Sequence, residues 1–325
     1  RFRRINGMGF RVNETVTTKA ARQAGYRQNA TGPQKTLGHL AMVAFAALVA
    51  GSFSVGAIVA PHIGPASLNA ARFLVAIVLM GIVVRVVLRR PIPFPAAPWR
   101  FFVMGGAMAL FFITMFTALG MTDPVSTGAV FTLMPFLSTF FGYLFLRQVP
   151  RGLVLPSLIL AGVGAIWVIF GGDLDAMRRF DVGRGETIFF FGVVGHAAYA
   201  SLVRFYNRGE PVLVFTFWTL LATGVIIAVY GVGEIAATHW QSIPFKVWAG
   251  ILYLAIFTTA GTFFLLQFAA LRLPASKVLA YNYLTPTLII IYEGLLGHGW
   301  ASFSVIAGAG VTILGLVLLV LAPDG

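Results

Sequence analysis

Cysteine is absent from the 325-residue chain, and charged residues make up only 10% of it. The absence of cysteine excludes disulfides, thiolate metal sites and a cysteine nucleophile. Soluble domains are about a quarter charged, so a chain with 58% hydrophobic residues has too few polar side chains to cover a surface that faces water. The composition therefore excludes a soluble enzyme, a disordered chain and a disulfide scaffold, and it indicates a membrane protein.

Apolar segments long enough to cross a bilayer follow one another along most of the chain. A helix needs about 20 mainly apolar residues to cross a hydrocarbon core roughly 30 Å thick. Clusters of proline, glycine and charge separate the segments. The sequence predicts an all-α polytopic membrane protein with ten transmembrane helices, at 37–60, 66–88, 99–120, 124–147, 151–171, 185–206, 211–232, 247–271, 275–297 and 301–322.

The net charge of +13 is explained by topology. If the N-terminus is cytoplasmic, 18 basic residues lie on the inner side, and only Arg178, Arg179, Arg184 and Lys246 lie on the outer side. This split follows the positive-inside rule. No soluble face interleaves basic residues with stacking aromatics, so no nucleic-acid partner is expected. We expect a multi-pass protein of the inner (cytoplasmic) membrane, with both termini cytoplasmic and residues 1–36 as a disordered basic tail.

Two stretches of sequence resemble each other across the chain. FTALGMTDPVSTGAVFTLMP (116–135) and FAALRLPASKVLAYNYLTP (268–286) share a phenylalanine, an Ala-Leu pair and a closing Leu-x-Pro. We therefore expect two repeats, 37–171 and 185–322, joined by a periplasmic linker at 172–184. Five spans in each repeat is an odd number, so the second repeat enters the membrane from the opposite side. Such an inverted repeat favours alternating access around a central cavity.

These features resemble the drug/metabolite transporter superfamily, in its ten-helix form with two EamA-like repeats. The resemblance rests on Leu133-Met134-Pro135, on Leu284-Thr285-Pro286, on Arg72 early in the second span, and on glycine-rich fifth and tenth spans. The family often has Gly-Glu where this chain has Arg147-Gln148 and Gly297-His298, so no role is carried over for that glutamate. The overall character is most similar to the YddG-type exporters of aromatic and other neutral amino acids.

The resemblance implies a secondary transporter, not an enzyme, that exports small neutral metabolites such as aromatic or apolar amino acids. No cofactor or metal is expected, and the sequence has no GxxxxGK[ST] motif for ATP. The partners are then the bilayer and a small-molecule substrate, with the protein as a monomer or a homodimer. Efflux of cationic drugs is the alternative, and an integral-membrane enzyme is the alternative from another class.

Pro135 and Pro286 fall at the midpoints of predicted spans. A proline inside a helix removes one backbone hydrogen bond and frees the carbonyl four residues earlier, here on Phe131 and Asn282. Unsatisfied backbone at that depth is tolerated only against protein or water. Both prolines are therefore predicted as hinges beside the cavity, the alternative being kinks that serve packing.

His196 lies at the midpoint of the predicted span 185–206, with Tyr199 one turn away on the same face. An imidazole at this depth can bind a substrate carboxylate or carry a proton. The alternative is a neutral histidine bonded to a neighbouring backbone carbonyl.

The stretch YNYLTP (281–286) is the most polar part of any predicted span, and Tyr281, Asn282 and Thr285 are predicted to bind the amino or carboxyl group of a substrate. Interhelical hydrogen bonding is the alternative reading. Glu293 and Arg72 are candidates for coupling: Arg72 can neutralise a substrate carboxylate or snorkel to the headgroups. Further candidate substrate contacts are the hydroxyls of the first span and apolar wall residues, namely Ser52, Ser54, Phe53, Met115 and Met134.

Overall fold

The computed structural model describes residues 29–323 apart from 120, 123–127, 129, 181 and 296–299. For residues 53, 54, 57, 58, 60, 119 and 293 it describes the backbone alone. All regular elements within these residues are helices.

The first half of the chain contains α2 (Gly32–Val59), η1 (Ala60–His62), α3 (Pro65–Ile82), the π-helix η2 (Val83–Val87), α4 (Trp99–Leu119), α6 (Met134–Leu146) and α7 (Val154–Ile169). The short α8 (Leu174–Arg178) follows. The second half contains α9 (Arg184–Tyr206), α10 (Val212–Tyr230), α11 (Val232–Ala237), η3 (Trp240–Ser242), α12 (Phe245–Ala255), the π-helix η4 (Ile256–Gly261), α13 (Thr262–Ala270), α14 (Ala275–Val278), the 3-10 helix η5 (Leu279–Tyr283), α15 (Leu284–Leu295) and α16 (Phe303–Leu321).

Seven helical stretches among the described residues are long and apolar enough to cross a membrane. They lie in α2, α3 with η2, α4, α9, α10, α12 to α13, and α16. Two further apolar helices, α6 and α7, are shorter, and α15 follows the two short elements α14 and η5. Each of the ten predicted spans thus contains helix, but only seven stretches reach full spanning length, and the count of ten spans stays a prediction.

The long helices are apolar on their outer faces as well as on their inner faces. On α3, Phe73 and Met80 are buried, whereas Leu74 and Val78 are more than half exposed. Residues four apart share one side of a helix, so the exposed pair forms a stripe that faces away from the protein. A helix that is apolar all round is typical of a membrane span.

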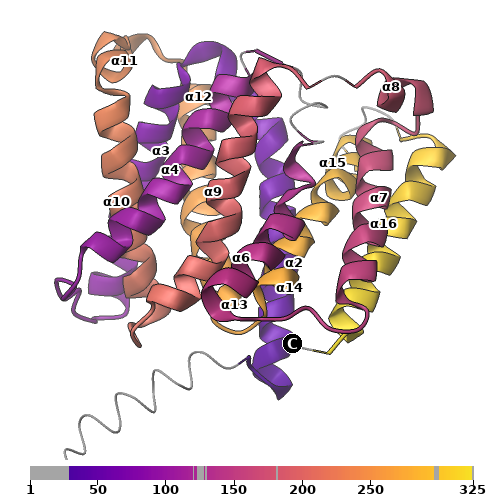
Figure 1. Ribbon diagram of the computed structural model, residues 1–325. Helices are drawn as coiled ribbons and strands as arrows, with labels where there is room; N and C mark the ends of the chain where they lie inside the picture. The colour runs from indigo at the N-terminus through magenta and orange to yellow at the C-terminus, as the bar shows by residue number, and fades with distance from the viewer. Residues whose placement is uncertain are drawn as a thin grey trace, which may run out of the picture.

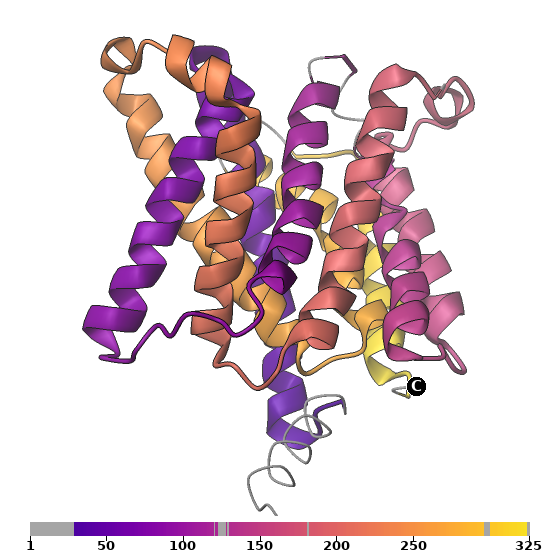
Figure 2. The same ribbon diagram turned by 60° about the vertical axis from the view of Figure 1, so that its left-hand side comes forward.

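The helices stand side by side as a bundle, and α2 begins at the same end where α16 stops (Figure 1). We call this the terminal end, and the other the opposite end. The packed pairs include α4 with α9, α3 with α10, α2 with α13, and α7 with α16. A view from another side shows the extended connection between α3 and α4 crossing the terminal end (Figure 2). The largest cluster of buried apolar side chains lies where α2, α4, α9, α10 and α13 meet.

Glycine allows α7 and α16 to pack closely. A Cβ atom added to Gly164 would lie 2.6 Å from the backbone nitrogen of Thr312, and one added to Gly315 would lie 2.5 Å from that of Ala161. The contact made by the earlier residue of α7, Ala161, is to the later residue of α16, Gly315, and Gly164 contacts the earlier Thr312. The two helices are therefore antiparallel. Small residues at such contacts let helix backbones approach in a membrane protein.

The first span begins earlier than predicted. Helix α2 starts at Gly32, not at 37, and the residues before it make contacts: the Ala30 backbone nitrogen donates to the Arg272 carbonyl at 2.8 Å, and Arg204 donates to Asn29 at 2.6 Å. Part of the predicted disordered tail, residues 29–36, thus makes contacts or belongs to α2, and residues 1–28 lie outside the described part of the chain.

The predicted continuous spans 124–147 and 275–297 are also corrected. Helix α6 begins only at Met134, after a turn at 132–133, and the span from 275 is divided into α14, η5 and α15. Pro135 therefore lies in the first turn of α6, where a missing backbone N–H costs nothing. Pro286 lies in the first turn of α15, at the change from the 3-10 helix η5 to α-helix. The physical cause is the proline itself, which has no backbone N–H to donate to the carbonyl four residues earlier, so regular α-helical hydrogen bonding does not run through it.

At the opposite end, side chains cap the helices that begin there. Glu186 accepts from the backbone nitrogen of Gly183 at the start of α9 and also from the Thr122 hydroxyl. Asp173 caps α8, and the backbone N–H groups of Ala176 and Asp175 hold the pKa of its carboxyl below the usual range. Glu186 thereby connects the start of the second half to the α4–α6 connection.

Candidate functional site

His196 is held at the centre of the bundle because α9 lies close to α4. Gly192 lies one turn before it and Gly195 directly before it, and a Cβ atom on Gly195 would lie 2.7 Å from the Ala107 carbonyl oxygen of α4. This close approach brings the imidazole onto Phe111, with ring centroids 4.5 Å apart. Phe131 lies 6.5 Å from the imidazole on another side.

Both ring nitrogens of His196 lack a hydrogen-bond partner among the described residues, although the side chain is only 5% exposed. A buried polar atom without a partner costs about 1–3 kcal/mol. The alternative reading, a histidine bonded to a nearby backbone carbonyl, is therefore not what the structure shows. The imidazole is left with its hydrogen-bonding capacity unused at the centre of the protein.

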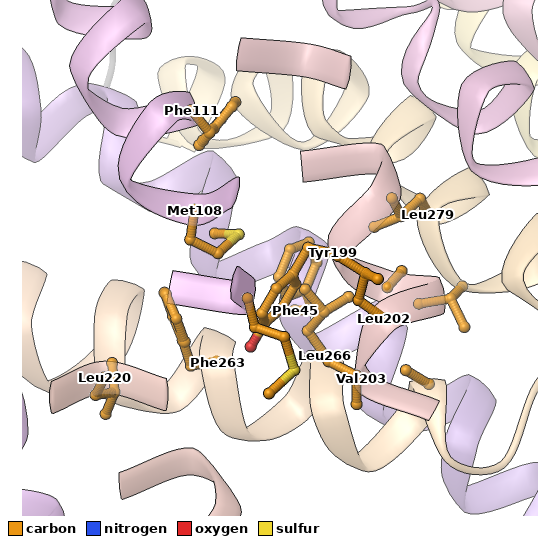
Figure 3. Close-up of a cluster of buried hydrophobic side chains, with 14 of the residues drawn as sticks. Phe45, Met108, Phe111, Tyr199, Leu202, Val203, Leu220, Phe263, Leu266 and Leu279 are labelled. Carbon is orange, nitrogen blue, oxygen red and sulfur yellow. The ribbon is translucent and has the colours of Figure 1, made fainter. Parts of the chain in front are cut away.

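Phenylalanines surround this imidazole. Phe111 packs against Phe112 at 5.3 Å and against Phe189 at 5.9 Å, and Phe131 stacks on Phe189 with nearly parallel rings. Figure 3 shows Phe111 and Met108 of α4 above a group of side chains from α2, α9 and α13. The environment of His196 is thus aromatic and apolar.

Most of the polar YNYLTP stretch connects the two halves of the chain. In η5, the Tyr281 hydroxyl lies 2.9 Å from His39 Nδ1 of α2, and the Tyr283 hydroxyl donates to the Thr132 carbonyl at 3.1 Å. The Asn282 amide donates to the Met134 sulfur at 3.0 Å. The alternative reading of this stretch, interhelical hydrogen bonding, accounts for Tyr281 in this structure. The carbonyl that Tyr283 uses belongs to Thr132 and not to Phe131, the residue predicted from the position of Pro135.

Two side-chain atoms of the same stretch have unused capacity. Asn282 Oδ1 and Thr285 Oγ1 are buried and have no partner among the described residues. They resemble His196 in this respect. The predicted site thus separates into groups that are already bonded and groups that are open to a ligand.

Tyr199 belongs to the bonded groups. Its hydroxyl accepts from the Gln267 amide of α13 at 2.6 Å, and Gln267 accepts in turn from the Thr216 hydroxyl of α10 at 2.5 Å. All three side chains are fully buried. Sequence reasoning missed this network, although Gln267 could have been noticed as an amide within the predicted span 247–271.

Arg72 is buried and does not reach the surface as a snorkelling arginine would. Its Nε donates to the Thr259 hydroxyl at 2.8 Å and its Nη2 to the Thr258 carbonyl at 3.3 Å. The guanidinium carbon lies 4.9 Å from the centroid of Phe112. Phe112 in turn packs against Phe111, so Arg72 and His196 lie on either side of one aromatic pair.

The remaining predicted residues are placed as follows. Ser52 donates to the carbonyl of Val49 in its own helix at 2.6 Å, so its hydroxyl hydrogen is already used. Met115 is partly buried and packs against the main apolar cluster, which also contains Met134. The predicted contacts at Phe53, Ser54 and Glu293 concern side chains that lie outside the described part of the structure.

A small hollow at the terminal end lies away from these residues, between α6, α7 and α14, and Gln148, Ser276 and Lys277 are among its lining residues. His196 is not among the residues that line this hollow, and a central cavity stays a prediction. No group of three acidic, histidine or cysteine side chains close enough to hold a metal ion occurs among the described residues.

Three comparisons with known proteins bear on this arrangement. The sequence model of the EamA-like transporter family matches residues 36–170 and again residues 183–321. The uncharacterized transporter YyaM of Bacillus subtilis (strain 168) is 26% identical over 212 residues, which cover 65% of this chain and 68% of that protein. A crystal structure described only as that of a protein superposes with a TM-score of 0.73 at 17% identity, covering 90% of this chain and 98% of the other, and shows that the fold is shared.

The double match covers most of the chain, and it agrees with the apolar helices that the structure contains. The chain is thus an integral, multi-pass membrane protein and a member of the EamA-like transporter family.

Proposed function

We propose that this protein is a secondary transporter that exports small neutral metabolites, in particular aromatic or apolar amino acids, by alternating access. One observation carries the proposal: His196 is buried among phenylalanines at the centre of the bundle with neither ring nitrogen bonded. A buried group of this kind is stabilised when a ligand supplies the missing hydrogen bond. The helices around it must separate before such a ligand can enter.

Ten spans arranged as two inverted repeats are part of the proposal. The family matches twice, and the helix packing is consistent with an exchange of the halves: α4 with α9 corresponds to α2 with α13, and α6 with α9 corresponds to α2 with α15. The fifth and tenth predicted spans, α7 and α16, pack antiparallel. Two halves of this kind can exchange conformations and so open the centre to either side in turn.

The proposed orientation places the terminal end in the cytoplasm and the protein in the inner membrane. The inner side then carries 18 basic residues and the outer side four. Three of the outer four, Arg178, Arg179 and Arg184, lie at or beside α8 and the start of α9. An excess of Lys and Arg on the cytoplasmic side is the usual determinant of membrane orientation.

The proposed substrate class follows from the residues around the centre. Phe111, Phe131 and Phe189 offer aromatic surface to an apolar side chain, and His196, Asn282 and Thr285 offer unused hydrogen-bonding atoms. Efflux of cationic drugs needs a carboxylate to meet the cation. The buried charge that contacts this group of phenylalanines, through Phe112, is instead the positive charge of Arg72, which disfavours that alternative.

A transport assay tests the proposal. Purified protein in liposomes is given radiolabelled phenylalanine, threonine or a cationic dye, and protein-free liposomes serve as the control. Saturable movement of the amino acids without movement of the dye is the expected result. Movement of the dye alone supports drug efflux. If none of the three compounds moves, the transport proposal is contradicted and an integral-membrane enzyme becomes the favoured alternative.

A further inference from the structure

Arg72 is a buried cation whose partners are all neutral. It is 5% exposed, and its two hydrogen bonds go to a hydroxyl and a backbone carbonyl on η4. None of the ion pairs within the described part of the chain includes it, and its third nitrogen, Nη1, makes no hydrogen bond there. No described acidic side chain therefore neutralises this positive charge.

Keeping such a charge inside a membrane protein is costly. Burying an ionised side chain costs several kcal/mol of hydration free energy. The cost is offset only when an opposite charge and hydrogen bonds replace the lost water contacts. Ionisable groups at this depth usually mark a substrate or ion site. A planar guanidinium with free donors has the geometry that binds a carboxylate through two parallel hydrogen bonds.

Contacts with η4 and with Phe112 fix the position of the Arg72 guanidinium. Thr259 donates its own hydroxyl hydrogen to the Leu254 carbonyl at 2.9 Å, so its oxygen presents lone pairs to Arg72. Both threonines lie on the π-helix η4, and π-helical turns occur frequently at functional sites. On its other side Arg72 lies over Phe112, which restricts the guanidinium further.

The position of Arg72 fits a ligand at the centre of the protein. Phe112 lies 5.3 Å from Phe111, and Phe111 lies 4.5 Å from the His196 imidazole. When the helices separate, a small molecule with an aromatic or apolar side chain can lie along this pair of rings with its polar end at Arg72.

We propose that Arg72 binds the carboxylate of the transported metabolite, and that Thr259 and Thr258 hold the guanidinium while the site is empty. This inference rests on the proposed function and makes it more specific. The transporter then selects its substrate by a carboxylate group, and not only by a neutral overall charge.

The test compares L-phenylalanine with L-phenylalaninamide, which has the same side chain and amino group but no carboxylate. In proteoliposomes the wild type is expected to prefer phenylalanine. Arg72→Gln should lower phenylalanine uptake roughly ten- to hundredfold, the effect expected for loss of a charge-assisted hydrogen bond, and leave uptake of the amide unchanged or raised. Arg72→Lys keeps the charge without the planar fork and should fall between the two.

Arg204→Gln is the matched control, because Arg204 is also buried and also donates its Nε to a backbone carbonyl, that of Ala270, but lies at the terminal end. It should not change the preference for phenylalanine over the amide. If Arg72→Gln and Arg72→Lys lower the uptake of both compounds equally, Arg72 is only a link between α3 and η4 and the inference is wrong. Equal uptake of both compounds by the wild type also overturns the inference but leaves the proposed function standing. A wild type that moves neither compound nor threonine overturns the proposed function, and the inference with it.

Discussion

Individual side chains at the centre divide into those that stabilise the bundle and those that carry unused hydrogen-bonding capacity. Tyr199, Gln267 and Thr216 are bonded to one another across α9, α13 and α10. His196 is equally buried but unbonded. The two groups should respond to substitution in opposite ways, because a satisfied polar group stabilises the fold and an unsatisfied one destabilises it.

His196→Leu should therefore keep or raise the thermal stability of the purified protein while it lowers amino-acid uptake. The substitution removes two buried nitrogens without partners, which relieves about 1–3 kcal/mol before any loss of packing against Phe111. Melting in detergent and uptake into liposomes are measured on the same preparation. A clear fall in melting temperature with normal uptake would show that His196 serves the fold.

Tyr199→Phe should have the opposite effect. It leaves the Gln267 amide without its acceptor, and we expect a loss of about 1–3 kcal/mol in stability with the affinity for phenylalanine unchanged. The matched control is Tyr143→Phe, because Tyr143 lies on the exposed face of α6 at 57% exposure. The double variant Tyr199→Phe with Gln267→Leu should recover part of the stability, since both polar partners are then removed. If Tyr199→Phe weakens phenylalanine binding and leaves stability unchanged, Tyr199 contacts the substrate and does not serve the fold.

At the scale of helices, close backbone contact decides where glycine is needed. Gly164 of α7 faces the backbone of Thr312, whereas Gly310 of α16 has no atom within 4 Å of the position of an added Cβ. The same chemical change should therefore have different consequences on the two helices. The two glycines form a natural pair of test and control.

Gly164→Ala should destabilise the protein by about 1–3 kcal/mol, because the new methyl group overlaps backbone atoms that cannot move aside cheaply. Gly310→Ala should leave stability unchanged or raise it slightly, since alanine favours helix. Thermal melting of both variants in one detergent measures the difference. Equal stability of the two would mean that α7 and α16 do not pack as the structure shows.

At the scale of the whole molecule, orientation can be tested without background because the chain has no native cysteine. Val182→Cys places a thiol at the opposite end and Phe94→Cys places one at the terminal end, both at well-exposed positions. A membrane-impermeant maleimide should label the first in intact cells and the second only after permeabilisation. The reverse pattern would contradict the proposed cytoplasmic termini.

The driving force of export is a second property of the whole molecule. Glu293→Gln and His196→Asn each remove a group that can carry a proton within the predicted spans. If the transporter is coupled to protons through either group, that substitution should abolish uptake against a gradient but leave exchange down a gradient measurable. Accumulation that survives both substitutions would show that neither residue couples transport to protons.

The sequence by itself determined the class of the protein, because composition and apolar length depend on no contact between distant residues. It located the helices to within a few residues wherever proline, glycine and charge mark their ends, and it selected His196 by its depth alone. It did not predict that α6 begins one residue before Pro135, or that 3-10 helix changes to α-helix two residues before Pro286, because a proline inside a long apolar segment is compatible with either a kink or a start.

Only the tertiary structure decided which polar groups are already bonded. Tyr199 and His196 are one turn apart on one helix, and nothing in the local sequence distinguishes them. Their difference arises because Gln267 approaches Tyr199 from α13, whereas the His196 imidazole packs on phenylalanine rings and its nitrogens have no hydrogen-bond partner among the described residues. Hydrogen bonding between helices depends on atoms brought together from distant parts of the chain, and the pattern along a single helix does not contain that information.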